Sequence, residues 1–439
     1  MSRPDDLAGA INRRPQLTGP PVVELRRGVG PWSGLAMAIA LGIALVDQAD
    51  ELPGWQNSWR DVTDLLRPLA LLVGGPISIA AGCWQGGRER RHGTGELLAG
   101  GARSPLRQAL TAAVPSALWP AVGYLTAAAG ALLAAWPYVG AWGRPSFSLI
   151  VSDACALASL GIVGFVVGRL APWRLTAPAL GGLVYLGFGT LSYTGARSWL
   201  NPAEQYFPRW DAPVWWYAPA SIMWTGGLAC AIFLVFAARR RAVALVPLTA
   251  AALAAALLTG EEGPWRPDPR AGRLVCDGGA PQVCVSARDR SLLPQVTAAL
   301  NGANARLHGI PHAPSRWVSG PQRTRAGEAP LPPPGFFSLR GRLREPAEYA
   351  NWAVGQLIMK ECRSGGGDSA SHLRAQRVGM GVVQWLAPSA VFDAAPWPEA
   401  KEHAARLHAL PPSEQHAFLT RYLAFLSSEV CRPEKVPLP

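Results

Sequence analysis

Long apolar stretches separated by short polar segments fill the first 260 residues of the chain. Seven stretches approach the roughly 20 residues that a helix needs to cross a bilayer: residues 31–46, 68–84, 109–136, 147–168, 175–193, 214–237 and 243–258. The third is long enough to tilt, or to be broken at Pro115 or Pro120. The pattern predicts an all-α polytopic membrane domain, with six spans within residues 31–241 and a seventh within 242–259.

The pattern changes near residue 260, where polar and apolar positions begin to alternate at helical spacing. Apolar residues three and four apart predict helices over 291–307, 347–359, 372–386 and 412–431. Two short apolar segments, 273–275 and 283–286, flank a Gly/Pro turn and predict a hairpin, and the Pro-rich segment 328–335 predicts a loop or hinge. Residues 260–439 are therefore expected to form a mainly helical α+β domain.

Basic residues alternate with acidic ones along the loops of the first half. Arginines cluster at 26–27, 88–107, 169–174 and 239–241, whereas acidic residues fill the loop that holds Asp47, Asp50, Glu51, Asp61 and Asp64. Because loops rich in Lys and Arg stay in the cytoplasm, the N-terminal segment 1–30 is expected inside and the C-terminal domain outside the cell. If the seventh segment does not insert, the C-terminal domain is cytoplasmic instead.

The net charge of +12 follows from these same arginine clusters, so a plasma-membrane protein is favoured over a nucleic-acid-binding one. Only 16% of residues are charged, against roughly 25% in soluble domains. The first thirty residues are polar and basic and lack the short apolar core of a cleavable signal peptide, so we expect the first span to act as its own insertion signal.

The seven cysteines divide between the two halves. Cys83, Cys155 and Cys230 fall in or beside predicted spans, and the other four lie in the C-terminal domain. An even number in an external domain favours disulfides. Cys276 and Cys284 flank the hairpin turn and are expected to pair, which leaves Cys362 with Cys431, although four cysteines allow three pairings. No pair has the C-x-x-C spacing of a zinc site, so no metal or other cofactor is expected.

The loop 86–107 between the second and third spans is charged, and its middle predicts a short amphipathic helix on the membrane surface. Thr94 can cap the helix, Glu96 lies in its first turn, and Gly100 and Gly101 end it. Two general explanations remain open for this loop: basic inside loops occur in every polytopic protein, and surface helices of this kind occur in other contexts.

The loop resembles that of a known family at six positions in the pattern E-x-x-x-G-T-x-E-L-L: Glu89, Gly93, Thr94, Glu96, Leu97 and Leu98. It is similar to the loop between the second and third spans of ABC-2 type exporter permeases. The resemblance covers roughly residues 26–241. It implies that the loop is a coupling helix that docks on a separate ATPase subunit, and that two permeases, identical or different, pair in the bilayer. Gly100 and Gly101 replace the family's Thr-Pro, and the seventh span and C-terminal domain are additions.

The chain carries no ATP site of its own, because none of its lysines (Lys360, Lys401 and Lys435) precedes Ser or Thr as a Walker A motif requires. No catalytic constellation stands out, so an enzyme is not expected. Asp153, near the outer end of the fourth span, is a candidate polar site in the membrane, with placement at the bilayer interface as the alternative. The alternative to a permease is a membrane-anchored binding or sensor protein whose external domain is the working part.

Overall fold

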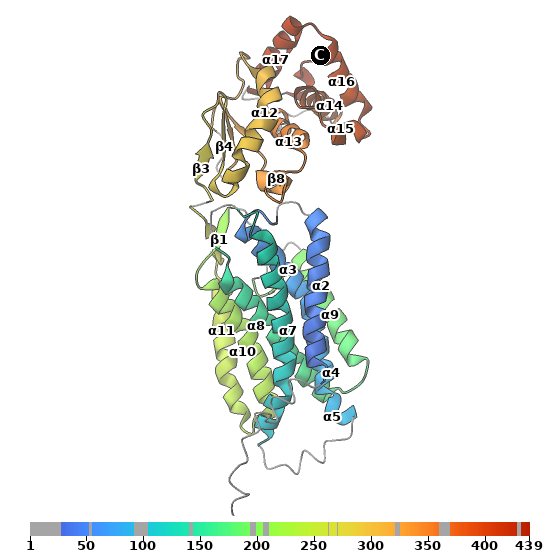
Figure 1. Ribbon diagram of the computed structural model, residues 1–439, viewed down its shortest axis with the longest axis vertical. Coiled ribbons are helices and arrows are strands. Elements are labelled where there is room, and N and C mark those ends of the chain that lie inside the picture. Colours follow the sequence, from blue (N-terminus) through green and yellow to red (C-terminus); the bar gives the residue numbers. More distant parts are fainter. Residues whose placement is uncertain are drawn as a thin grey trace, which may run out of the picture.

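The structure, a computed structural model, describes eleven segments of the chain: residues 28–51, 55–91, 104–139, 144–193, 199–204, 210–261, 263–269, 271–320, 325–359, 369–427 and 432–439. A bundle of long helices forms one end of the molecule, and a smaller C-terminal domain stands on the other end (Figure 1).

The bundle is built from long, mainly apolar helices. They are α2 (Gly30–Glu51), α3 (Trp59–Leu69) continued by the π-helical turn η2 (Ala70–Gly74) and α4 (Gly75–Gly86), α7 (Pro105–Ala135), α8 (Phe147–Leu170), α10 (Tyr217–Ala237), and α11 (Leu245–Leu258) with the turn η3 (Arg241–Ala244) before it. Within the described residues, these give six helices long and apolar enough to cross a membrane. The prediction of a helical membrane domain is confirmed at that level.

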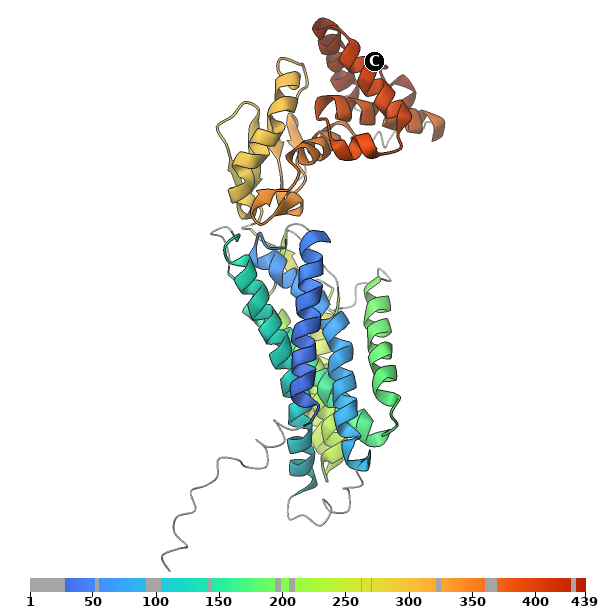
Figure 2. The same cartoon turned by 45° about the vertical axis from the view of Figure 1, so that its right-hand side comes forward.

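The predicted fifth span is helix α9 (Thr176–Tyr193), which is not one of those six. Its apolar part, Thr176–Leu191, is shorter than theirs. Figure 2 shows α9 at the edge of the bundle, where it packs mainly on α4. Among the described residues, six of the seven predicted spans, including the seventh at 243–258, are thus helices long and apolar enough to cross a membrane, and the predicted fifth span at 175–193 is a shorter apolar helix.

The helix that contains the predicted second span begins at Trp59, well before Pro68, so the assignment of Asp61 and Asp64 to a polar loop is wrong. Ser58 caps the helix by accepting a hydrogen bond from the Asp61 N–H, and Arg60 pairs with Asp64 one turn further on. These contacts keep the charged turns helical. Pro68 lies inside α3 and η2 follows directly, which is consistent with the usual association of π-turns with irregular helical hydrogen bonding.

Helices α4 and α8 approach each other at backbone distance. A Cβ placed on Gly164 would lie 2.1 Å from the carbonyl oxygen of Ile79, and one on Gly168 would lie 1.9 Å from that of Cys83. The same holds in the other direction, since a Cβ on Gly82 or Gly86 would lie 2.1 Å from a carbonyl oxygen of α8. Small residues that let helices approach in this way replace hydrophobic burial as the source of packing inside a membrane.

The basic clusters collect at one end of the bundle. The short helix α5 (Arg88–Arg91) follows α4 there, and Figure 1 places it at the end opposite the C-terminal domain. Arg169, in the last turn of α8, lies at the same end, and its side chain pairs with Glu89 of α5. Basic residues of two predicted inner loops, 88–107 and 169–174, therefore lie at the same end of the bundle.

The C-terminal domain combines a four-stranded sheet with helices. Strands β3 (Leu274–Cys276), β4 (Gln282–Ser286), β5 (Arg316–Val318) and β6 (Glu328–Pro330) lie in that order, the first pair antiparallel and the others parallel. The fully buried Trp317 and Tyr349 are among the largest side chains of the core. Its helices are α12 (Leu293–Leu307), α13 (Pro346–Ile358), α14 (Ser369–Leu386), α15 (Ala390–Ala394), α16 (Pro398–Ala409) and α17 (Pro412–Ser427).

The predicted hairpin is confirmed as β3–β4, and the four predicted helices correspond to α12, α13, α14 and α17. The prediction of a loop over 328–335 is wrong, because Glu328–Pro330 pairs with β5 and the 3-10 turn η5 (Pro334–Phe337) follows. Two further pairs of strands are short: β1 (Asp211–Pro213) with β2 (Trp265–Pro267), and β7 (Ser338–Leu339) with β8 (Arg342–Leu343). The short turns η4 (Ala287–Leu292) and η6 (Pro433–Lys435) complete the domain.

Cys276 and Cys284 occupy paired positions of the hairpin and form the predicted disulfide. Asp277 closes the turn, since its carboxylate accepts hydrogen bonds from Thr297 Oγ1 and from the N–H of Gly279 and Val283. Desolvation raises the pKa of Asp277, but these hydrogen bonds outweigh it and hold the pKa below its ordinary value. Cys362 and Cys431, the other predicted pair, lie outside the described residues.

Candidate functional site

The loop of the sequence motif leaves the bundle from α5. Glu89, the first residue of the motif, forms an ion pair with Arg169 at the end of α8. The Arg169 guanidinium in turn lies 5.6 Å from the ring centroid of Phe165. Because α4 and α8 already meet at their glycines, this ion pair ties the stem of the loop to the same two-helix unit.

A second arginine of α5 folds back on the end of α4. The Arg91 guanidinium lies 4.4 Å from the ring centroid of Trp84 and donates a hydrogen bond to the Trp84 carbonyl oxygen. Partial burial lowers the pKa of Arg91, and the positive charge of Arg174 in the α8–α9 connection lowers it further. The clustering therefore brings the basic residues of two predicted inner loops together.

The other motif residues, Gly93, Thr94, Glu96, Leu97 and Leu98, lie outside the described residues. Their role remains a prediction. The structure resumes at Ser104, whose hydroxyl accepts a hydrogen bond from the Arg107 N–H at 3.4 Å and caps α7. Both stems of the loop are thus held by defined contacts.

Asp153, the predicted polar site, lies inside the bundle and not at its surface. Its exposed fraction is 1%, on a turn of α8 that faces α3 and α7. The Tyr124 hydroxyl donates a hydrogen bond of 3.4 Å to the Asp153 carboxylate, and Arg67 Nε lies 3.9 Å from it. The residue is therefore one half of a buried ion pair, and its depth relative to the bilayer stays a prediction.

Arg67, the other half, was not identified from the sequence, because it stands one residue before the expected start of the second span. Its guanidinium lies 4.8 Å from the ring centroid of Tyr217, and its Nε donates a 3.3 Å hydrogen bond to the Pro202 carbonyl. Its Nη1 is buried and has no hydrogen-bond partner among the described residues. Arg67 also lines a narrow pocket together with Thr63, Asp64, Pro68, Leu149, Trp199, Glu204, Tyr217 and Trp265.

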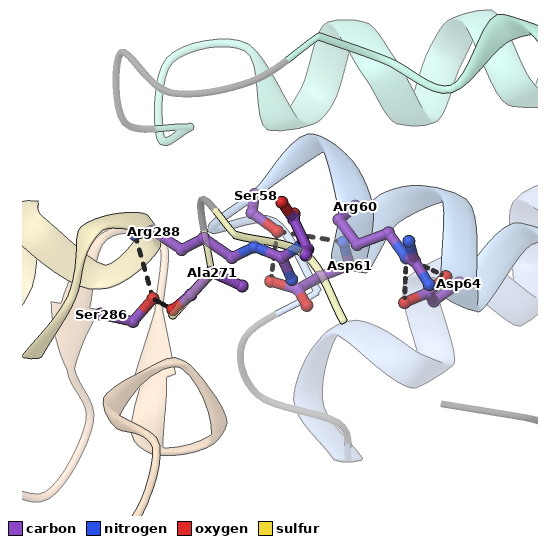
Figure 3. Close-up of polar contacts among 8 residues, drawn as sticks. Ser58, Arg60, Asp61, Asp64, Ala271, Ser286 and Arg288 are labelled. Atoms are coloured by element: carbon purple, nitrogen blue, oxygen red, sulfur yellow. Dashed lines mark hydrogen bonds and ion pairs between the residues drawn. The ribbon is translucent and has the colours of Figure 1, made fainter. Parts of the chain in front are cut away.

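Charged residues continue from this pair toward the C-terminal domain along the first turns of α3 (Figure 3). Arg60 Nε lies 2.7 Å from the Asp64 carboxylate, and its guanidinium lies 4.5 Å from the ring centroid of Trp265 in β2. Arg288 of the C-terminal domain lies in the same view and pairs with Asp268 at 2.9 Å. The junction between the two parts of the molecule is therefore polar.

Asn57, just before α3, holds the C-terminal domain on the bundle. Its Nδ2 donates to the carbonyl oxygens of Gly335 at 3.2 Å and Ser338 at 3.4 Å, and also to Ser338 Oγ. Its Oδ1 accepts from the Gly341 N–H at 3.1 Å. Since Asn57 is buried, the domain is seated on the helices by specific hydrogen bonds and is not merely tethered to them.

Replacing Asn57 by aspartate is expected to weaken the attachment of the C-terminal domain to the bundle. The substitution keeps the acceptor for Gly341 but removes every donor, and each lost hydrogen bond costs about 1 kcal/mol. Hydrogen–deuterium exchange of the β7–β8 segment should become about ten-fold faster or more, while exchange in α12 stays unchanged. Unchanged exchange in β7–β8 would show that the hydrogen bonds of Asn57 do not hold the C-terminal domain on the bundle.

The described residues contain no group of three or more His, Cys, Asp or Glu side chains that could hold a metal ion. Comparison of the chain with protein-family models, with curated protein sequences and with solved structures gives no match. The functional interpretation therefore rests on the residues and their geometry.

Proposed function

We propose that the protein is the membrane-spanning permease subunit of an ABC-2 type exporter. The observation that carries this proposal is the way in which the stem of the loop 86–107 is attached to the helices. Its first stem is fixed to α8 by Glu89–Arg169, and α4 and α8 are in backbone contact below it. A loop that receives force from a partner needs such a rigid attachment, whereas a loop that only obeys the charge rule does not.

In this proposal ATP is hydrolysed by a separate ATPase subunit, and movement of that subunit displaces the coupling helix. The α4–α8 pair then moves as one body, because neither helix can slide past the other without steric overlap at the glycines. Two permeases, each with its own ATPase partner, enclose the path of the substrate. We place the basic end of the bundle in the cytoplasm and the α+β domain with its disulfide outside the cell.

Charge reversal at the coupling helix tests this proposal. Glu96→Lys, or proline at Leu97, is expected to abolish retention of the ATPase subunit on inverted membrane vesicles, because docking depends on the helix and on its acidic first turn. The amount of retained ATPase is measured by mass spectrometry, and the permease content of the vesicles by immunoblot. The matched control is Glu434→Lys, an exposed change in the C-terminal domain. Equal retention in all three variants would remove the coupling role.

A membrane-anchored sensor is the second candidate, and one observation favours it. The C-terminal domain has a hydrophobic core of its own and is held on the bundle through the buried Asn57. A ligand-binding domain seated in this way could pass a signal to the helices without any ATPase. This alternative requires the full-length protein to bind a ligand through its C-terminal domain and to retain no ATPase subunit.

A further inference from the structure

The two-stranded hairpin β7–β8 lies at the base of the C-terminal domain, beside the upper ends of α2 and α3 (Figure 1). Its position is fixed by Asn57, which binds Ser338 at its start and Gly341 at its tip. A Cβ on Gly341 would also lie 3.8 Å from the Tyr138 carbonyl oxygen, just beyond the end of α7. The hairpin therefore sits at the rim of the membrane-spanning bundle.

Aromatic residues lie at this rim of the bundle. Trp136 at the end of α7 is 70% exposed, and its ring lies 5.8 Å from that of Trp59 at the start of α3. Tryptophan at both ends of a helical bundle is typical of the membrane–water interface. Because Tyr138 follows Trp136 by two residues, the hairpin tip lies within about one helical turn of Trp136 along the bundle.

The outward surface of the hairpin combines apolar and basic side chains. Phe336, directly before it, is 58% exposed, and Arg340, Arg342 and Arg344 are exposed along it. Behind Phe336, the ring of Phe337 packs 6.1 Å from that of Trp352, which is itself 55% exposed. Residues 336–345 contain three arginines and one glutamate, Glu345, so the segment carries a net positive charge.

The inner side of the same hairpin is fixed. Leu343 and Ser338 are buried, and Gln295 of α12 donates to the Gly341 carbonyl at 3.1 Å and accepts from the Leu343 N–H at 2.9 Å. Turning the arginines inward would break these contacts. The hairpin is thus fixed on α12 through its buried side, while Arg340, Arg342 and Arg344 stay exposed.

We propose that this surface, formed by Phe336, Trp352, Arg340, Arg342 and Arg344, binds the headgroups of anionic phospholipids in the leaflet next to the C-terminal domain. Phe336 enters the interface between headgroups and acyl chains, and the arginines bind phosphate oxygens. The partner is a lipid and not a protein, because the surface lies at the rim where the exposed apolar side chains of the helices already face acyl chains. The proposal holds whether the protein is a permease or a sensor.

Photo-cross-linking in a defined bilayer tests this proposal. The full-length protein carries benzoylphenylalanine in place of Phe336 and is reconstituted into nanodiscs of phosphatidylcholine with 30% phosphatidylglycerol, roughly the anionic fraction at which such electrostatic binding is strong. The matched control carries the same probe at Leu373, which is 50% exposed on α14. Lipid adducts are expected at position 336 and not at 373. The proposal would be overturned by equal yields of lipid adducts at the two positions. It would also be overturned if the probe at position 336 cross-linked only to the protein itself and not to lipid.

A second set of variants tests the charge. In the Phe336 probe background, Arg340→Gln with Arg342→Gln is expected to reduce the excess of phosphatidylglycerol over phosphatidylcholine adducts, by about five-fold for each arginine at low salt. The control pair Arg374→Gln with Arg421→Gln, both exposed elsewhere in the C-terminal domain, should keep that excess. Size-exclusion chromatography checks that both pairs are folded. An excess that survives loss of Arg340 and Arg342 would show that the surface does not select anionic lipid.

Discussion

Alanine in place of Gly164 is expected to destabilise the protein by about 1–3 kcal/mol, the usual range for overpacking a tight contact. The new methyl group would lie 2.1 Å from the Ile79 carbonyl oxygen, and backbone cannot move aside as a flexible side chain can. Helices α4 and α8 must separate, which also strains the Glu89–Arg169 ion pair at their ends. The effect should appear as a lower midpoint of thermal unfolding in detergent, followed by fluorescence-detected size exclusion.

Gly187 of α9 supplies the matched control, because a Cβ placed there has no neighbour within 4 Å. Alanine favours a helix over glycine by about 1 kcal/mol, so Gly187→Ala should leave the midpoint unchanged or raise it. The two substitutions are chemically identical and are expected to have opposite signs. If Gly164→Ala were as stable as Gly187→Ala, the close packing of α4 on α8 would be refuted.

Removal of one member of the buried ion pair is the second large effect. Arg67→Met leaves Asp153 with the Tyr124 hydroxyl as its remaining polar contact among the described residues, and the loss should be about 3 kcal/mol. Asp153→Leu should cost a similar amount, because it leaves the Arg67 guanidinium buried without a counter-ion. The double variant Arg67→Met with Asp153→Leu should be more stable than either single variant, since it buries no unpaired charge.

This double-mutant cycle is measured by the same thermal assay, with Arg374→Met as the control for removal of an exposed arginine. A coupling energy near zero, with additive losses, would mean that Arg67 and Asp153 do not interact despite their 3.9 Å separation. A positive coupling of at least about 1 kcal/mol is the expected result.

The helical bundle could be predicted because apolar length is visible in a window of sequence. Window hydropathy gave the start of the second span at Pro68, since Asp61, Asp64 and Arg67 lower the average. It could not show that Ser58 caps the helix or that Arg67 and Asp153, far apart in the chain, neutralise each other in space. The same limit hid the packing of α4 on α8, because spacing alone does not tell which glycines meet.

The C-terminal domain shows a different limit. The β3–β4 hairpin could be predicted because its turn and its cysteines are adjacent in the sequence. Strands β5 and β6 contain three residues each and pair in parallel across intervening chain, so neither has a periodic signal of its own. The hydrogen bonds between Asn57 and the β7–β8 hairpin join residues more than 270 positions apart and could not be predicted from the local sequence pattern.

One continuous helix also connects the stem of the loop 86–107 with the buried Arg67–Asp153 ion pair. The helix from α3 through η2 to α4 begins beside Asn57, where the C-terminal domain contacts the bundle, and ends close to Glu89, at the first stem of the loop 86–107. Arg67 lies on this continuous helix, just before the π-helical turn η2. A displacement of the loop would therefore reach the ion pair and the C-terminal domain through a single element.

The most direct test of the permease proposal is purification of the tagged protein from its native membrane in mild detergent, with mass spectrometry of the proteins that accompany it. The proposal predicts an ABC ATPase subunit that co-purifies with the wild-type protein and is lost in Glu96→Lys. A preparation free of any ATPase, under conditions in which a known ABC exporter stays assembled, would contradict it and leave the C-terminal domain as the working part of a sensor.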